Sequence, residues 1–371
     1  MRLEHKPVDL MLPARDLAKR RYATARENAV GSRPRGELVS RVIRRPEFGA
    51  LISFIAVYVF FLAFTHENNF ASLSGMASWM NSAAEIGIVA VPVGLLMIAG
   101  EFDLSVGAMA GTSSILVSIC VTLYNWPFWA ASAAALVVGA AVGFGNGLIR
   151  IKTQIPSFIV TLATWFVLAG ASLGISRTIT GTTAVSLTIT GFAKSLFAAK
   201  WKQFNVSILW WLAGAIAGTW ILTRTRAGNW IVGTGGNVEV ARGSGVPTNR
   251  VKIALFMGTA VASSLVGILD AVAFNGGNLT NGQNLVFDSL IAVIVGGTLF
   301  QGGYGSVPGI FLGAATYGLV AVGVLYTGWD TDYAELFLGV LLLGAFLGNS
   351  RFRRLVMTAR KAQSRRAARP E

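Results

Sequence analysis

Ten apolar stretches follow one another between residues 48 and 348, and most are about 20 residues long. An α-helix of about 20 apolar residues crosses the hydrocarbon core of a bilayer. Because lipid cannot satisfy backbone hydrogen bonds, segments of this kind must be helical. The sequence therefore predicts an all-α, polytopic membrane protein with about ten transmembrane helices. The expected spans are residues 48–65, 77–99, 104–123, 128–149, 156–176, 207–223, 253–274, 284–301, 308–326 and 333–348.

The charges favour a topology with both ends in the cytoplasm. Only 13% of the residues are charged, about half the share in soluble proteins, yet the net charge is +14. Residues 1–50 hold 12 Lys and Arg against 6 Asp and Glu, and residues 349–371 hold 8 against 1. By the positive-inside rule both ends stay inside, which requires an even number of spans. We expect a basic cytoplasmic arm (1–47), a transmembrane domain (48–348) and a basic cytoplasmic tail (349–371).

These basic ends are expected to contact membrane lipid and not nucleic acid. Clustered Lys and Arg beside a membrane attract anionic lipid headgroups. No aromatic residues are interleaved with the arginines, as base stacking would require. One loop fits the topology poorly, because residues 177–206 should lie outside although they contain four basic side chains. We expect a short surface helix there, from about Gly191 to Lys202.

Glycine and proline suggest how the spans pack. Residues 77–103 and 284–309 contain Gly and Pro where a spanning helix should be continuous, and broken helices are tolerated where they line a cavity or lie buried in protein. Elsewhere, glycines recur at four-residue spacing, which lets helices approach closely. We expect bundle packing at five such sets: 107/111, 139/143/147, 170/174, 214/218 and 309/313.

The chain lacks the residue patterns of common catalytic sites. Cys120 is the only cysteine, and both histidines, His5 and His66, lie outside the spans, so neither a metal site nor a catalytic residue is predicted. Acidic side chains within or near spans are functional candidates by default. The candidates for the translocation path or for helix caps are Glu85, Asp103, Ser105 and Asp288, with Asp270 as a further intramembrane acid.

The cytoplasmic loop 224–252 contains a short helix signal. Asn237 is a suitable N-cap, Glu239 lies in the first turn, and Gly245 with Pro247 ends the helix. These residues predict a two-turn helix from Val238 to Ser244. Because so short a helix is marginal alone in water, it requires a docking surface on its own spans or on another subunit.

Four stretches of the chain match known sequence motifs. Residues 100–107 (GEFDLSVG) are similar to GG(I/M)DLSVG, and residues 155–164 (IPSFIVTLAT) to PxFIVTLGT. Residues 235–246 read GGNVEVARGSGV and resemble GGNxEAAxxSGI, and residues 287–307 resemble the segment DxIAAVVIGGT…GGxGSV. In this order the motifs resemble those of the sugar permeases of bacterial ATP-binding-cassette importers (ribose, xylose and arabinose type), in the branched-chain amino acid and sugar permease superfamily, where the third is the coupling-loop motif. Glu101, Val240 and Gly243 depart from these patterns.

The resemblance implies a multi-pass permease subunit in the bacterial inner membrane. Its implied partners are a second permease copy (homodimer or heterodimer), two ATPase subunits that bind ATP and magnesium, and a periplasmic solute-binding protein. It implies no cofactor bound by this chain itself. The loop 224–252 would couple to the ATPase, through Gly236, Asn237, Glu239, Ala241, Arg242, Ser244 and Gly245. We expect transport of a sugar or related small polar solute.

Other functions remain open at this point. One is a permease for another solute, such as an amino acid, an autoinducer or a nucleoside. A second is an ion-coupled secondary transporter that acts alone and binds its ion through Glu85 and Asp270. A membrane-embedded enzyme is a third, against which the absence of a catalytic constellation counts.

Overall fold

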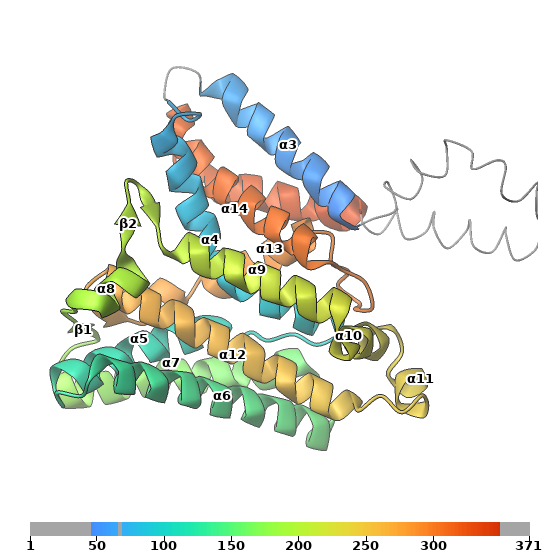
Figure 1. The fold of residues 1–371 in the computed structure, drawn as a ribbon, viewed down its shortest axis with the longest axis horizontal. Helices are drawn as coiled ribbons and strands as arrows, with labels where there is room; N and C mark the ends of the chain where they lie inside the picture. The colour runs from blue at the N-terminus through green and yellow to red at the C-terminus, as the bar shows by residue number, and fades with distance from the viewer. Residues whose placement is uncertain (1–45, 66–68, 349–371) are drawn as a thin grey trace, which may run out of the picture. The chain divides into compact units, whose positions relative to one another are not determined.

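The computed structural model describes residues 46–65 and 69–348, which are built almost entirely from helices (Figure 1). The predicted basic arm, apart from its last two residues, and the predicted basic tail lie outside the described residues. Each of the ten predicted spans overlaps one helix. These helices are α3 (Pro46–Phe64), α4 (Leu73–Ile98), α5 (Val106–Thr122), α6 (Phe128–Thr153), α7 (Ser157–Thr180), α9 (Ser207–Arg224), α12 (Thr248–Ala273), α13 (Leu285–Val295), α14 (Val307–Thr327) and the helix Tyr333–Gly348.

Six of these helices are long and apolar enough to cross a membrane: α3, α4, α6, α7, α12 and α14. The helix α9 has 18 residues, while α5, α13 and Tyr333–Gly348 are shorter apolar helices. The prediction of an all-α, polytopic membrane protein is confirmed.

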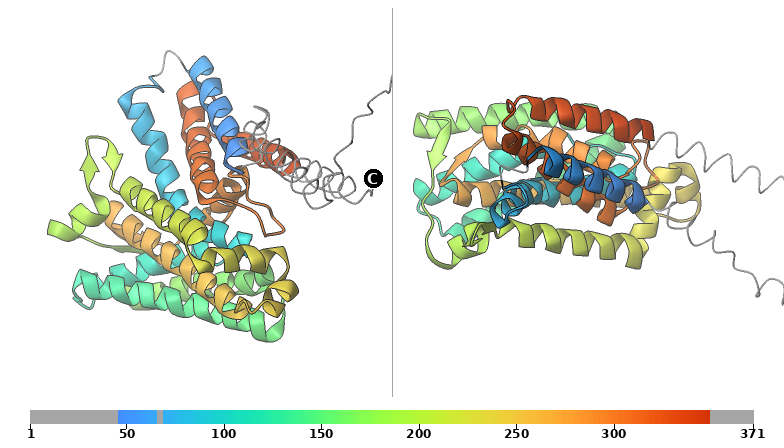
Figure 2. Two further views of the ribbon diagram at one scale, coloured as in Figure 1. Left: turned by 45° about the vertical axis from the view of Figure 1, so that its right-hand side comes forward. Right: turned by 90° about the horizontal axis from the view of Figure 1, so that it is seen from above.

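The helix α4 lies at the centre of the helical core. Of the residues in its most apolar window, 78% are buried, against 11% for α3. Contacts with α9, α12, α13 and α14 surround α4, and α3 packs on the outer side of α14 (Figures 1 and 2). Because lipid provides no hydrophobic drive for association, α4 is held by close packing and by its polar contacts.

Small residues provide this close packing where α6 crosses α12. A Cβ atom at Gly143 would lie 2.3 Å from the carbonyl oxygen of Phe256, and Gly139 and Gly147 meet α12 on either side. The expected packing of this glycine set is confirmed. It is wrong for Gly170 and Gly174, which have nothing within 4 Å in the described chain, because that face of α7 points away from the bundle.

Residues 77–103 and 284–309, which were expected to form broken helices, differ from that prediction. The helix α4 runs continuously through Pro92 and ends only at Ile98. The predicted span 284–301 is too long, because α13 has only 11 residues and ends at Val295. Gly100 and Gly297 follow these ends with φ angles of +83° and +86°, a conformation that glycine adopts without strain.

The two ends of the bundle carry different small elements. One end has α8 (Gly191–Ala198), the antiparallel pair β1 (Ala184–Ser186) and β4 (Gly276–Asn278), and the hairpin β2 (Lys200–Trp201) and β3 (Phe204–Asn205). The single turn η1 (Thr280–Gly282) follows β4. The surface helix expected to reach Lys202 thus ends at Ala198, two residues before the hairpin begins at Lys200. At the opposite end lie α10 (Arg226–Gly236) and α11 (Val238–Gly243) (Figure 1).

Candidate functional site

The predicted two-turn helix forms as α11, within one residue of its expected bounds. The side-chain oxygen of Asn237 accepts hydrogen bonds of 3.0 Å from the N–H groups of Glu239 and Val240. At the other end, Gly245 has a φ of +82°, and the N–H of Val246 donates to the carbonyl of Ala241. Both caps predicted from the sequence are therefore confirmed.

The faces of α11 differ from what the sequence suggested. Glu239 and Arg242 are exposed, as an interaction with another subunit requires, but Ala241 is buried. A Cβ added to Gly233 would lie 3.8 Å from the Cβ of Ala241, so this small residue faces α10 and not an external partner. Sequence reasoning missed Val240, whose side chain is 65% exposed. An apolar residue at an exposed position of a surface helix was the available signal.

A second helix, α10, precedes α11 and was not predicted. Thr225 caps its N-terminus by accepting from the N–H of Gly228, and the side chains of Ile231 and Thr234 are buried. Four glycines within eleven residues give this segment low intrinsic helix propensity. The helix is therefore stabilised by docking, since α10 packs against α4, α9 and α12.

The last turn of α10 touches two loops, one after α4 and one after α13. A Cβ atom at Gly235 would lie 1.8 Å from the carbonyl oxygen of Ile98 and 2.7 Å from the backbone nitrogen of Gly303. The N–H of Gly303 itself donates to that Ile98 carbonyl over 2.8 Å. Three backbones thus meet here: the end of α10, the loop after α4 and the loop after α13. A movement of the exposed α11 can reach both loops through this contact.

The two loops begin alike. After α4, the N–H groups of Gly100 and Glu101 donate to the carbonyls of Met97 and Leu96. After α13, Gly297 and Thr298 repeat this pattern toward Ile294 and Val293. Each loop then leads through a Ser-Val pair, residues 105–106 and 306–307, into the next helix. The pairs α4–α5 and α13–α14 therefore share the same backbone hydrogen-bond pattern and the same entry into the second helix. The sequence analysis did not detect this similarity.

Asp103 and Ser105 form a buried polar cluster and not a side-chain cap of α5. Both the N–H and the hydroxyl of Ser105 donate to Asp103 Oδ1, and Thr259 on α12 donates to Asp103 Oδ2. Asn146 on α6 donates to the hydroxyl of Ser105 over 3.1 Å. Ser105 makes no side-chain bond to the first N–H groups of α5. The cluster instead ties the loop after α4 to α6 and α12.

Glu101 lies beside this cluster in an ion-pair network. Arg150 Nε is 3.0 Å from Glu101 Oε2, and Lys252 Nζ is 2.5 Å from Glu101 Oε1. The exposed fractions of the three side chains are only 3%, 21% and 10% for Glu101, Arg150 and Lys252. Burial raises the pKa of Glu101, but the hydrogen bond and charge of Lys252, with Ser157 and Arg150, lower it below its ordinary value.

The other two candidate residues lie in separate places. Asp288 is in the first turn of α13, where Asn284 and not Asp288 is the N-cap. Glu85 lies on α4 and lines a small pocket together with Asp270 of α12. The structure therefore brings Asp103 and Ser105 together, but neither Glu85 nor Asp288 joins them.

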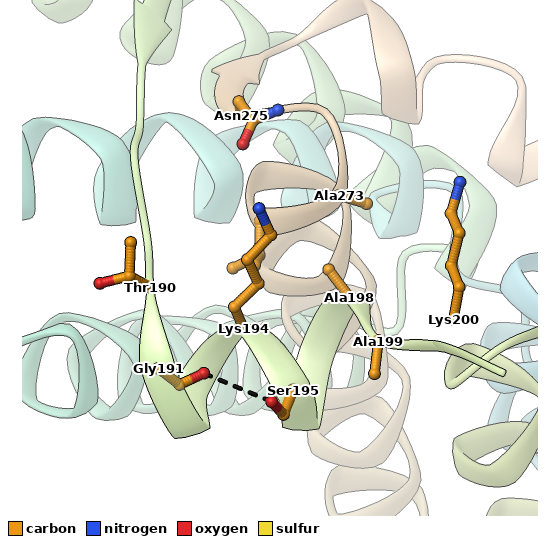
Figure 3. A pocket seen from close by; sticks show the side chains of 10 residues that line it. Thr190, Gly191, Lys194, Ser195, Ala198, Ala199, Lys200, Ala273 and Asn275 are labelled. Atoms are coloured by element: carbon orange, nitrogen blue, oxygen red, sulfur yellow. Dashed lines mark hydrogen bonds between the residues drawn. The ribbon is translucent and has the colours of Figure 1, made fainter.

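A larger pocket of about 700 Å³ opens beside that small one, at the end of the bundle that carries α8 (Figure 3). Lys194 points from α8 toward Asn275, and Lys200 follows on β2. Nowhere in the described ranges do three or more His, Cys, Asp or Glu side chains gather as a metal site would require.

Comparison with known proteins places this architecture among transport proteins. Residues 75–346 match the family described as the branched-chain amino acid transport system / permease component. The ribose import permease protein RbsC of Escherichia coli strain K12 is 29% identical over 286 residues, covering 75% of this chain and 86% of that protein. The xylose/arabinose import permease protein XylH of Sulfolobus acidocaldarius is 30% identical over 293 residues, covering 74% and 77%. No solved structure matches the chain.

Proposed function

Because the chain belongs to the branched-chain amino acid transport system / permease component family, we propose that it is the membrane-spanning subunit of an ATP-driven importer in the bacterial inner membrane. Its solute is a sugar or a related small polar molecule, since several similar relatives are named as ribose or xylose permeases. The partners are a second permease copy, two ATPase subunits that bind ATP and magnesium, and a solute-binding protein.

The observation that carries this proposal is the contact between α10 and the loops after α4 and α13. The helix α11 exposes Glu239, Val240 and Arg242 at one end of the bundle, where an ATPase subunit would dock. Closure of the ATPase on ATP would move α11 and, with it, the last turn of α10. Because Gly235 is packed directly on the backbones of Ile98 and Gly303, that movement would shift the loops after α4 and α13.

The role of this chain in transport is conformational, and no covalent step is assigned to it. The solute crosses at the interface between two permease copies as they change from outward-open to inward-open. Permeases for an amino acid, an autoinducer or a nucleoside would use the same coupling. A secondary transporter that acts alone would instead need no ATPase, and the following variants separate the two classes.

Replacement of Glu239 by alanine is expected to lower solute uptake several-fold without reducing the amount of inserted protein. The side chain is exposed on α11 and forms no ion pair with the residues that the structure describes. Uptake into proteoliposomes that contain the permease, its ATPase and its binding protein measures the effect. Asp332→Ala, which removes an exposed acid at the opposite end of the bundle, is the control. Uptake by the permease alone, driven by an ion gradient and unchanged by Glu239→Ala, would contradict the proposal.

Replacement of Val240 by aspartate is expected to weaken ATPase binding more than Val240→Ala does. An apolar side chain that is 65% exposed loses contact area in the alanine variant, whereas aspartate also places a charge in a desolvated interface. Co-purification of the ATPase with the tagged permease measures this ranking. Equal recovery with both variants would show that α11 does not dock through Val240.

A further inference from the structure

Two acidic residues that the sequence presents 185 positions apart line one small pocket. Glu85 lies on α4 and Asp270 lies in the last turns of α12, and both line a pocket of about 120 Å³. The two carboxyl groups therefore face the same cavity, although they come from different helices. Asp270 is only 6% exposed, so water would screen a repulsion between the two charges poorly. Both carboxyl groups can be ionised in such a place only when a positive charge lies beside them; without it, at least one holds a proton.

Two further oxygens of the same pocket lack partners. Ser207, at the start of α9, is 5% exposed, and its hydroxyl makes no hydrogen bond within the part of the chain that the structure describes. The side-chain oxygen of Asn205, on β3, is likewise buried without a partner there. Buried polar atoms are almost always satisfied by protein, water or a bound group. These two oxygens therefore mark a place for a ligand.

The hairpin above the pocket is held in a defined position. Asn81 precedes Glu85 by about one helical turn, and its side-chain nitrogen donates to the carbonyl of Gln203 over 2.9 Å. Its side-chain oxygen accepts from the N–H of Asn205 over 2.8 Å. These two hydrogen bonds tie the hairpin to α4. They fix the position of Asn205 relative to Glu85 even when no ligand occupies the pocket.

Lys200 does not supply the positive charge that would balance Glu85 and Asp270. Lys200 lines both this pocket and the larger one beside it, and its side chain is exposed. Among the described residues, neither Lys200 nor Lys194 forms an ion pair with Glu85 or Asp270. Figure 3 shows both lysines among the residues that line the larger pocket of about 700 Å³. The small pocket shares Ala198, Lys200 and Ala273 with the larger one, and its unpaired polar atoms are the oxygens of Asn205 and Ser207.

We propose that Glu85, Asp270, Asn205 and Ser207 bind a hard divalent cation, with Ca²⁺ as the best fit. Carboxylate, amide and hydroxyl oxygens are the ligand types that Ca²⁺ takes, and two carboxylates match its charge. The sequence alone predicted no metal site, because no His or Cys cluster signals one and the four ligands come from four separate elements. A bound cation joins the outer parts of α4, α9 and α12 and stabilises that end of the bundle.

Thermal unfolding of the purified full-length chain in detergent tests this proposal. After treatment with a chelator, added Ca²⁺ is expected to raise the Tm in a saturable manner, at lower concentrations than Mg²⁺ and without a comparable effect of Na⁺. Glu85→Gln and Asp270→Asn should abolish the increase. Ser207→Ala removes one neutral ligand and should weaken the apparent affinity roughly tenfold while the protein still folds.

Terbium luminescence provides a second measurement that does not depend on the stability of the variants. The ring of Trp210 stacks on Phe197, which lines the pocket, so a bound Tb³⁺ should be sensitised by excitation of tryptophan. Ca²⁺ should displace it. Asp332→Asn is the control, because Asp332 lies in an exposed turn beside Trp329, lines neither pocket and should leave the signal unchanged.

Three results would overturn the proposal. The first is a wild-type Tm that does not respond to Ca²⁺, which would mean that Lys200 or shared protons neutralise the pair. The second is an unchanged Ca²⁺ response in Glu85→Gln and Asp270→Asn. The third is a terbium signal that is lost only in Asp332→Asn. None of these measurements involves an ATPase or a transported solute, so they are independent of the proposed function.

Discussion

Replacement of Gly235 by alanine is expected to abolish solute uptake, whereas the same substitution at the adjacent Gly236, which the family resemblance places in the coupling loop, should lower uptake far less. The two glycines differ only in what surrounds them. A Cβ atom at Gly235 would meet the backbones of Ile98 and Gly303, while one at Gly236 has nothing within 4 Å. Backbone atoms in packed loops cannot move aside as a flexible side chain can.

The energetic difference between the two variants should be large. Overpacking a tight site costs about 1–3 kcal/mol and sometimes more, because the surrounding structure must shift. In contrast, alanine at an open helical position is neutral or stabilising by about 0.4–1 kcal/mol. Uptake in proteoliposomes, together with the quantity of folded protein after solubilisation, gives both readouts for each variant.

The result also tests how motion is transmitted. If Gly235→Ala retains wild-type uptake, the contact of α10 with the two loops is not the route by which α11 acts on the bundle. A loss of uptake in both variants would instead indicate that the whole turn tolerates no side chain. The coupling model requires the difference between the two neighbours.

Replacement of Glu101 by glutamine is expected to lower the Tm of the purified protein. The decrease should be larger than for any other substitution of a single acidic residue proposed above. The substitution leaves Arg150 and Lys252 with no carboxylate between them, although Lys252 is only 10% exposed. Breaking a buried ion pair by removing one partner costs about 3–5 kcal/mol, since the remaining charge is not compensated. Thermal unfolding followed by intrinsic fluorescence measures the loss.

A second substitution should restore much of the stability. In the double variant Glu101→Gln with Lys252→Gln, the buried positive charge is removed and two amides of suitable length can bond to each other. Glu239→Gln is the matched control, because this exposed acid has no ion pair among the described residues and should not change the Tm. A Tm for Glu101→Gln equal to that of the control would show that the network contributes nothing to stability.

The network also explains one departure of this chain from the motif that it resembles. The motif GG(I/M)DLSVG, which residues 100–107 resemble, has a second glycine where this chain has Glu101. A carboxylate at that place would be unfavourable in a buried loop if it were alone. Arg150 and Lys252 approach it from α6 and α12, so that its charge is compensated. The family motif reveals the departure, and only the fold identifies the two partners.

Local features were predictable from the sequence alone. Each of the ten spans is marked by its own run of apolar residues, so that hydropathy alone locates all ten helices. The bounds of α11 follow from Asn237 and Gly245, whose side chain or backbone conformation acts within a few residues. Features of this kind depend on neighbours in the chain, and the order of residues specifies them directly.

Other features depend on neighbours in space, and the sequence did not reveal them. The helix α10 has too many glycines to be recognised by propensity, and it forms because it docks on α4, α9 and α12. The predicted span 284–301 is cut short at Val295, where Gly297 turns the chain into the loop that meets α10.

The sequence by itself determined that this chain is a helical membrane protein of the permease family with an exposed two-turn helix, because hydropathy, caps and motifs are local. Only the tertiary structure decided that Glu85 faces Asp270 and that Gly235 lies against Ile98 and Gly303. These groups are far apart in sequence. Packing between helices brings them together, and no pattern within a single segment encodes that packing.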